Sequence, residues 1–272
     1  LMSMGNHELT TFIRSSLKPF QILPLISSGT AEKFDLDDKA IAISCGSHVG
    51  SKLHAREVFK ILWNANIDVE YLQCPIPPSS SSRLEHNCSG KHAAFLATCK
   101  KMKWPLEEYL NNSHPLQIEI NRRIAEILTI PTEELVSAQD DCGAPTLHLR
   151  LSQMAYLYAC LGSSQNPEFE KIIRSMLSNP VLVSGEGRFD TELMRVSHGQ
   201  LVSKGGAEGI QCISKLGDGL GLAIKVEDGA KRAKHAVAIE ILKKLDWVTP
   251  TGLDELKLLN TYFKPGLKLE VR

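Results

Sequence analysis

The chain has 272 residues, of which 43% are hydrophobic and 23% are charged. This composition is typical of a globular protein with one large domain or two smaller ones. The 31 basic and 31 acidic residues cancel, so the charge balance does not favour nucleic acid or an anionic membrane surface as a partner. A small neutral or zwitterionic ligand fits this composition better.

Seven cysteines, an odd number, are scattered along the sequence. Their distribution indicates reduced thiols in a cytoplasm, because secreted proteins of this kind carry a paired disulfide framework. No apolar run reaches membrane-spanning length, and the first residues lack the basic and apolar regions of a signal peptide. We therefore predict a cytoplasmic protein with neither a membrane nor a nucleic-acid partner.

The predicted elements begin at residue 15, with no strand-like run before it. Apolar spacing predicts a helix at 15–28 that Pro24 interrupts, and further helices at 53–64, 91–100, 114–128, 151–161, 167–177 and 230–245. Short apolar runs predict strands at 40–45, 134–138, 210–214 and 222–226. Glycine-rich segments at 204–209 and 217–221 are interpreted as turns. No internal repeat and no clear domain linker interrupts this series.

The most unusual stretch is His86-Asn87-Cys88-Ser89-Gly90-Lys91-His92, which gathers a thiol, a hydroxyl, an amine and two imidazoles. A helical pattern begins directly after it, so we place the stretch at a loop-to-helix junction, with Gly90 supplying the turn. Backbone N–H groups and the helix dipole at such a junction stabilise a thiolate or an anion. The stretch is therefore either the wall of an active site or metal site, or a capped helix with one inward cysteine.

Two serines are candidate nucleophiles. Ser15 and Lys18 form the single Ser-x-x-Lys of the sequence, and residues three apart share a helix face. A lysine made neutral by burial can take the proton of such a serine, although a capping Ser15 beside a solvated Lys18 is the alternative. Ser47 follows the predicted strand at 40–45 and is flanked by Gly46, His48 and Gly50, and catalytic groups often lie at such strand-to-loop positions. Lys225 could meet either serine or face solvent.

A metal site is the third possibility. Cys88 and Lys91 can share one face of a turn, and Cys142 lies in a second polar loop beside Asp140. Two thiolates and a nitrogen can hold zinc in tetrahedral geometry. Lysine is an uncommon ligand, however, so buried structural cysteines are the alternative interpretation.

Six motifs occur in a fixed order along the chain. They are Arg14–Gln21, Cys45–Gly50, His86–His92, Asp140–Pro145, Ser184–Thr191 and Lys204–Gly209. In this order they resemble the asparaginase II family, the class 3 or Rhizobium etli-type L-asparaginases. The resemblance covers essentially the whole chain and implies one α/β domain (α+β mixed) over residues 1–272. The implied fold is serine β-lactamase/glutaminase-like, with a mainly antiparallel sheet.

The resemblance also implies an activity and roles for particular residues. It implies hydrolysis of L-asparagine to L-aspartate and ammonia by a homodimer. Two Ser-Lys pairs are implied, Ser15 with Lys18 and Ser47 with Lys225, together with zinc near the substrate and no organic cofactor. The implied zinc ligands are Cys88, Lys91 and Cys142. The implied substrate contacts are Arg14, His92, Asp140, Arg188 and Glu208, with Asp140 facing the α-amino group.

The expected mechanism begins with a serine attacking the side-chain amide carbon while a lysine accepts its proton. The lysine then protonates ammonia, and water releases aspartate from the acyl-enzyme. Which serine attacks stays open. The alternatives are a related Ser-Lys acyl hydrolase such as a glutaminase, or a catalytically silent homologue that acts as a binding module. The family's two strands before the Arg-Ser motif are not found here, so we expect an N-terminally truncated chain with an unpaired sheet edge.

Overall fold

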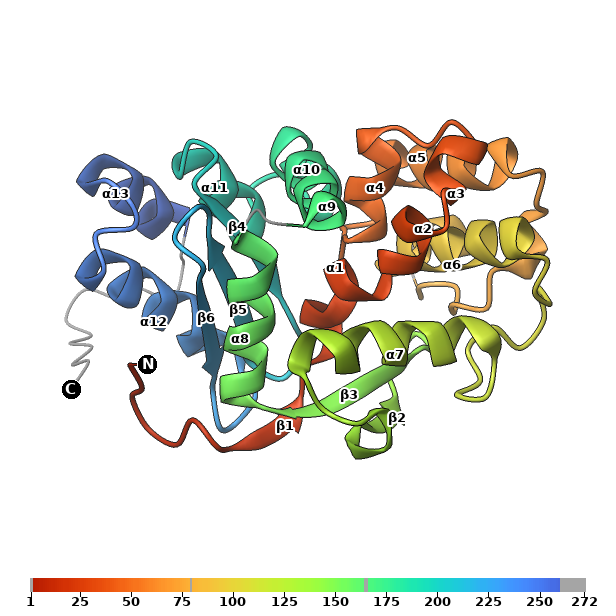
Figure 1. The fold of residues 1–272 in the computed structure, drawn as a ribbon. Coiled ribbons are helices and arrows are strands. Elements are labelled where there is room, and N and C mark those ends of the chain that lie inside the picture. Colours follow the sequence, from red (N-terminus) through yellow and green to blue (C-terminus); the bar gives the residue numbers. More distant parts are fainter. Residues whose placement is uncertain (1, 79, 164–165, 260–272) are drawn as a thin grey trace.

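The computed structural model describes residues 2–78, 80–163 and 166–259 (Figure 1). Helices dominate these residues, and the strands form two small antiparallel sheets. This mixture confirms the α/β (α+β mixed) prediction at the level of fold class. No helix of the described residues is long and apolar enough to cross a membrane.

The first sheet brings the start of the chain beside its middle. Its strands are β1 (Thr10–Phe12), β2 (Val136–Gln139) and β3 (Pro145–Arg150), in the order β1-β3-β2. β1 was missed by the sequence analysis because three residues are too few to show a pattern. Strands β1 and β2 both run antiparallel to β3, with Phe12 paired with His148 and Gln139 with Pro145. The segments that follow β1 and β2 in the chain therefore both start near the Pro145 end of β3.

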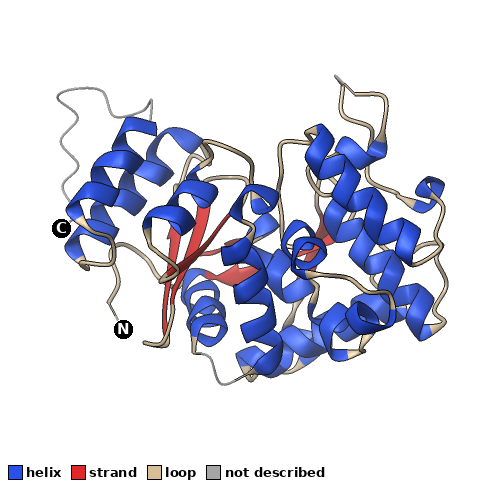
Figure 2. Ribbon diagram, turned by 90° about the horizontal axis from the view of Figure 1, so that it is seen from above, coloured by secondary structure: helices blue, strands red, loops and turns tan. Residues whose placement is uncertain are grey.

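The second sheet is built from β4 (Leu201–Gly205), β5 (Ile210–Lys215) and β6 (Leu220–Lys225), in that order. Side chains on successive residues alternate between its two faces. Val202, on one face, belongs to the larger hydrophobic cluster of the molecule, whereas Leu201 belongs to a smaller cluster on the other. Seen from above, helices flank the strands on both sides (Figure 2).

Helix α8 (Leu151–Gly162) packs on β5 and β6, and α11 (Phe189–Val196) packs on β4. Helices α12 (Lys231–Lys244) and α13 (Pro250–Leu259) complete the smaller cluster. The remaining helices surround the larger cluster. They are η1 (Arg14–Leu17), α1 (Lys18–Gln21), α2 (Leu23–Ser27), α3 (Thr30–Lys33), α4 (Asp38–Ser44), α5 (Lys52–Asn64), η2 (Val69–Tyr71), η3 (Arg83–Glu85), α6 (Ser89–Met102), α7 (Pro115–Leu128), η4 (Thr132–Glu134), α9 (Pro167–Ser178) and α10 (Pro180–Val183).

Most predicted elements are confirmed with small shifts at their ends, but three are not. The predicted helix at 15–28 is three short pieces, and Pro24 lies in the first turn of α2, where proline is tolerated. The predicted strand at 40–45 is helix α4, because the Asp37 side chain caps it by accepting from the Ala40 N–H at 3.0 Å. The predicted turn at 204–209 begins inside β4.

Gly90 lies within helix α6 and does not supply the predicted turn. Its role is close packing, because a Cβ built at Gly90 would lie 2.2 Å from the Ile43 carbonyl oxygen. The glycine therefore lets α6 lie directly against the end of α4 and sets the position of the residues around both helix ends.

Gly90→Ala is expected to lower the free energy of unfolding by about 3 kcal/mol, because the added methyl meets rigid backbone. Urea unfolding followed by circular dichroism measures this change. Lys100→Ala, at an exposed position of the same helix, is the matched control and should change stability by less than about 0.5 kcal/mol. Equal stability of Gly90→Ala and the unmodified protein would contradict the close contact.

Candidate active site

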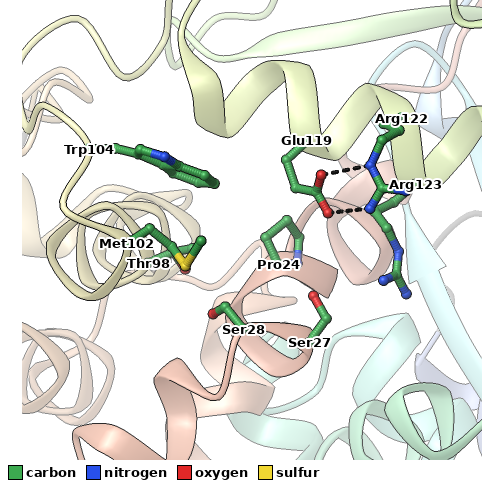
Figure 3. A pocket seen from close by; sticks show the side chains of 9 residues that line it. All are labelled: Pro24, Ser27, Ser28, Thr98, Met102, Trp104, Glu119, Arg122 and Arg123. Carbon is green, nitrogen blue, oxygen red and sulfur yellow. Dashed lines mark hydrogen bonds and ion pairs between the residues drawn. The ribbon is translucent and has the colours of Figure 1, made fainter.

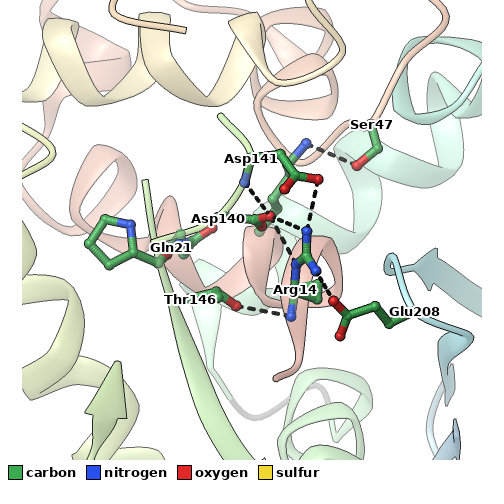
Figure 4. Close-up of polar contacts among 9 residues, drawn as sticks. Arg14, Gln21, Ser47, Asp140, Asp141, Thr146 and Glu208 are labelled. Atoms are coloured by element: carbon green, nitrogen blue, oxygen red, sulfur yellow. Dashed lines mark hydrogen bonds and ion pairs between the residues drawn. The ribbon is translucent and has the colours of Figure 1, made fainter. Parts of the chain in front are cut away.

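Ser47 and Lys18 meet although 28 residues separate them. Lys18 lies at the start of α1 and is fully buried. Its Nζ donates to Ser47 Oγ at 2.9 Å, to the Asn87 carbonyl oxygen at 3.5 Å, and to the Gly46 carbonyl oxygen. Three acceptors match the three N–H groups of an ammonium ion. The contact gives the partly exposed hydroxyl of Ser47 (Figure 4) a direct partner in a buried amine.

The backbone around Ser47 is held on both sides. The Ser47 N–H donates to the Val183 carbonyl at 2.8 Å, and the His48 N–H donates to the Asn87 carbonyl at 3.2 Å. The His48 ring stacks on the His54 ring with centroids 4.7 Å apart, and burial lowers the pKa of His48 well below its usual value. A neutral, packed imidazole therefore supports the serine loop.

The expected Ser-Lys pairs are not the ones that the structure forms. Ser15 is partly exposed, and its hydroxyl makes no hydrogen bond to the described residues. Lys225 Nζ donates to the carbonyl oxygens of Glu208 at 2.6 Å and Val226 at 2.9 Å. The predicted pair of Ser47 with Lys225 is therefore not formed in this structure, because β6 ends beside the turn at 206–209 and Lys18 lies next to Ser47.

Lys204 is a second buried lysine of the site, and the sequence analysis missed it. Its Nζ donates to the Gly205 carbonyl oxygen at 2.7 Å. Burial lowers the pKa of Lys204 to about 7, with Asp190 opposing the shift and Lys18 adding to it. The charge of Lys204 also acts on His48, beside Ser47. The apolar residues just before the glycines were the available signal that this lysine lies on a strand.

Arg14 is the centre of a charged cluster beside the serine (Figure 4). Its φ of 53° is left-handed, and its N–H donates to Thr146 Oγ1 at 3.0 Å. The guanidinium pairs with Asp140 at 2.7 Å, with Asp141 at 3.0 Å and with Glu208. Burial opposes its charge, but the hydrogen bond to Asp140 and the other carboxylates raise the pKa of Arg14. Because three carboxylates face one cation, the cluster favours an added ammonium group.

The Cys142 thiol is the centre of a third group. A hydrogen bond from Cys88 lowers the pKa of Cys142 far below its usual value despite burial, and Lys91 and His92 add to this effect. The pKa of Cys88 is raised well above its usual value by the same hydrogen bond and by burial. His92 Nδ1 bonds the Tyr109 hydroxyl at 2.7 Å, whereas the buried Nε2 faces Cys142 without a hydrogen bond of normal geometry.

The group around the Cys142 thiol has enough donor atoms for a metal ion only if Lys91 is counted as a ligand. The described residues contain no group of three His, Cys, Asp or Glu side chains that could hold a metal ion. With Lys91 included, two thiols and an amine converge, and they suit zinc by ligand type. The carboxylate of Asp140 also acts on Lys91, so the thiol group and the Arg14 cluster adjoin each other.

Residues from several of the motifs therefore lie together, and comparison with known families is decisive. The sequence matches the model of the L-asparaginase II family over residues 1–269. The chain belongs to the L-asparaginase II family. Membership suggests hydrolase activity on L-asparagine. A comparison with proteins of curated function found no match.

Not every residue expected from the asparaginase II resemblance joins the site. Arg14, Asp140 and Glu208 are in contact, and His92 adjoins Cys142. Arg188 is exposed before helix α11, and no hydrogen bond or ion pair joins its side chain to the described residues around Ser47. Its expected substrate contact therefore has no support in the geometry.

A hollow of about 340 Å³ elsewhere in this asparaginase II chain is separate from the candidate site (Figure 3). It lies between α2, α6 and α7. Its lining includes Trp104, Ser28 and Glu119, and Glu119 is paired with Arg122 at 2.6 Å. It contains none of the residues that the motifs select, so we do not assign the reaction to it.

Proposed function

We propose that this chain is an L-asparaginase that hydrolyses L-asparagine to L-aspartate and ammonia through an acyl-enzyme on Ser47. The observation that carries the proposal is the 2.9 Å contact between the Nζ of the fully buried Lys18 and the Oγ of the partly exposed Ser47. A serine needs such a base to become a nucleophile at neutral pH. Ser15 has no comparable partner among the residues that the structure describes, so Ser47 is the better supported of the two serines.

The acylation step uses Lys18 as the proton carrier. In its neutral form Lys18 accepts the Ser47 proton as Oγ bonds to the side-chain amide carbon of asparagine. The tetrahedral intermediate collapses by breaking the C–N bond, and the same proton passes to the departing nitrogen. Ammonia leaves, and a β-aspartyl ester of Ser47 remains.

The deacylation step needs a base for water. We assign this role to Lys204, because a lysine with a pKa of about 7 is neutral in a large fraction of molecules at neutral pH. Water loses a proton to Lys204 and attacks the ester carbonyl, and the C–O bond to Ser47 breaks. The proton held by Lys204 then passes to Ser47 Oγ as the bond breaks, so L-aspartate leaves with Ser47 protonated and Lys204 neutral again.

Recognition of the substrate rests on the Arg14 cluster. Three carboxylates around one guanidinium attract the α-ammonium group of an amino acid, and Asp140 is the most enclosed of the three, with a side chain 10% exposed. Asp140 contacts Arg14 at 2.7 Å, so it is held in place before the substrate arrives. We assign Asp140 the contact with the α-amino group.

Zinc fits the thiol group, and we propose that Cys88, Lys91 and Cys142 hold it. The orphaned Nε2 of buried His92 beside Cys142 is the structural observation that favours an added cation near these donors. Binding would release the protons of Cys88 and Lys91, since both ligands must be deprotonated. When bound, zinc would supply a fixed positive charge that helps position the substrate.

Four further features that family membership implies are also proposed for this chain. They are a single domain, the serine β-lactamase/glutaminase-like fold, a homodimer and a cytoplasmic location. The single domain is supported by β4, which contributes Val202 to the larger hydrophobic cluster and Leu201 to the smaller one. Light scattering of the purified protein tests the homodimer, and a monomer mass would contradict it.

The rate should rise with pH through about 7, because Lys204 acts as a base only when neutral. Its pKa is about 7 in the folded protein, well below the usual value of 10.5, so the neutral form is lost as the pH falls below 7. We expect kcat to fall about tenfold per pH unit on that side. Initial rates of ammonia release between pH 5 and 9 measure this, and a flat profile would contradict it.

The activity itself is tested by ammonia release from purified protein with L-asparagine or L-glutamine. Release from asparagine that far exceeds release from glutamine supports the proposal. Preference for glutamine would make the chain a glutaminase. Release from neither substrate, in folded protein supplied with zinc, would favour a catalytically silent binding module.

A further inference from the structure

Asp190 holds the backbone on both sides of Lys204. It is buried in the first turn of α11. Its Oδ1 accepts from Ser203 Oγ at 2.7 Å and from Gln211 Nε2 at 2.8 Å, and its Oδ2 accepts from the Gly205 N–H at 2.9 Å. Ser203 and Gly205 directly flank Lys204 in β4, so one carboxylate fixes the strand segment that carries the lysine.

Lys234 holds the turn that follows. It is buried in α12, and its Nζ donates to the carbonyl oxygens of Gly206 at 3.1 Å and Ile210 at 3.0 Å. These two oxygens lie at the opposite ends of the turn between β4 and β5. Neither Lys204 nor Lys234 forms a direct ion pair with Asp190 within the described residues. The charges of Asp190, Lys204 and Lys234 still influence one another without direct ion pairs.

We propose that Asp190 and Lys234 are positioning residues for Lys204, fixing its place at the end of β4 and setting the charge around its amine. The proposal rests on the function proposed above, in which Lys204 is a base. Ser-x-x-Lys and cysteine motifs gave no sign of this pair, because Asp190 and Lys234 lie far apart in the sequence, on helices α11 and α12.

The two residues act on the Lys204 amine with opposite sign. Asp190 stabilises its charged form, and Lys234 disfavours it. Asp190 itself stays ionised, because Lys204 and Lys234 lower its pKa against the effect of burial. Lys204 also has charge interactions with five other titratable groups. They are Lys18, Cys45, His48, Cys88 and Cys212. None of these is changed in the variants below.

The test is the pH dependence of kcat in Asp190→Asn and in Lys234→Met, assayed on the full chain with L-asparagine. Asp190→Asn should move the acid limb of the profile about one unit lower, and Lys234→Met should move it about one unit higher. Loss of structure alone lowers kcat, but it cannot move the acid limbs of the two variants in opposite directions. Glu192→Gln, on the same helix α11 but paired with Arg195 at the surface, should leave the limb in place.

A third variant covers a failure of Asp190→Asn to fold. Ser203→Ala removes one hydrogen bond of Asp190 and keeps both charges, so it should lower kcat severalfold without moving the limb. Shifts in the same direction, or no shift in a folded Lys234→Met, would overturn the inference. Failure of the proposed function gives a different result, since the limb would then persist in Lys204→Met. A limb that Lys204→Met removes and the other variants do not move would overturn the positioning role alone.

Discussion

Ser47→Ala should lower kcat for asparagine hydrolysis by a factor on the order of 10³ or more, because it removes the nucleophile that Lys18 contacts at 2.9 Å. Ammonia release under saturating asparagine measures the loss. The fold should survive, since the Val183 carbonyl accepts from the Ser47 N–H and the Asn87 carbonyl from the His48 N–H, and neither bond uses the Ser47 hydroxyl.

Ser15→Ala is the matched control for this result. Ser15 is the serine of the Ser-x-x-Lys motif, but its hydroxyl has no hydrogen bond to the described residues, so we expect a loss of less than about tenfold. An inactive Ser15→Ala beside an active Ser47→Ala would reverse the two assignments. Near-normal activity in both variants would exclude a serine acyl-enzyme at either position.

Cys142→Ala should abolish zinc binding and raise KM for asparagine by about 100-fold, because Cys142 is the shared partner of Cys88, Lys91 and His92. Metal analysis of protein purified with added zinc measures the first effect, and initial rates measure the second. Cys99→Ala is the matched control, since Cys99 is a buried thiol of helix α6 whose pKa burial raises to about 12.

Zinc retained by Cys142→Ala would contradict the ligand assignment. A second outcome separates the roles of the metal. If chelation abolished turnover while asparagine still bound Ser47→Ala with unchanged affinity, zinc would act in the chemical step and not in positioning the substrate. Asparagine binding to Ser47→Ala is followed by calorimetry with and without a chelator.

The order of the motifs indicated segments that lie together in the structure, but not the contacts among them. Lys18 and Ser47 were both candidates, yet their pairing depends on how the end of α4 lies against α1. A Ser-x-x-Lys spacing favours the local partner Ser15, because sequence spacing reports only neighbours along a helix. Tertiary packing decided which serine the lysine meets.

The misses have physical causes in particular residues. The apolar run at 40–45 is buried on all sides in α4, and a continuous apolar run does not distinguish a buried strand from a buried helix. Gly90 suggested a turn because glycine often makes one, whereas here its missing Cβ admits the Ile43 carbonyl. Lys204 was assigned to a turn because of the glycines that follow it, although it lies near the end of strand β4.

The measurement that tests the central claim most directly is peptide mapping of enzyme quenched in acid during turnover of L-asparagine. Mass spectrometry then locates the β-aspartyl ester, which acid preserves. The account predicts the ester on the peptide that contains Ser47 and its absence in Ser47→Ala. An ester on Ser15, or on any residue that persists in Ser47→Ala, would contradict it.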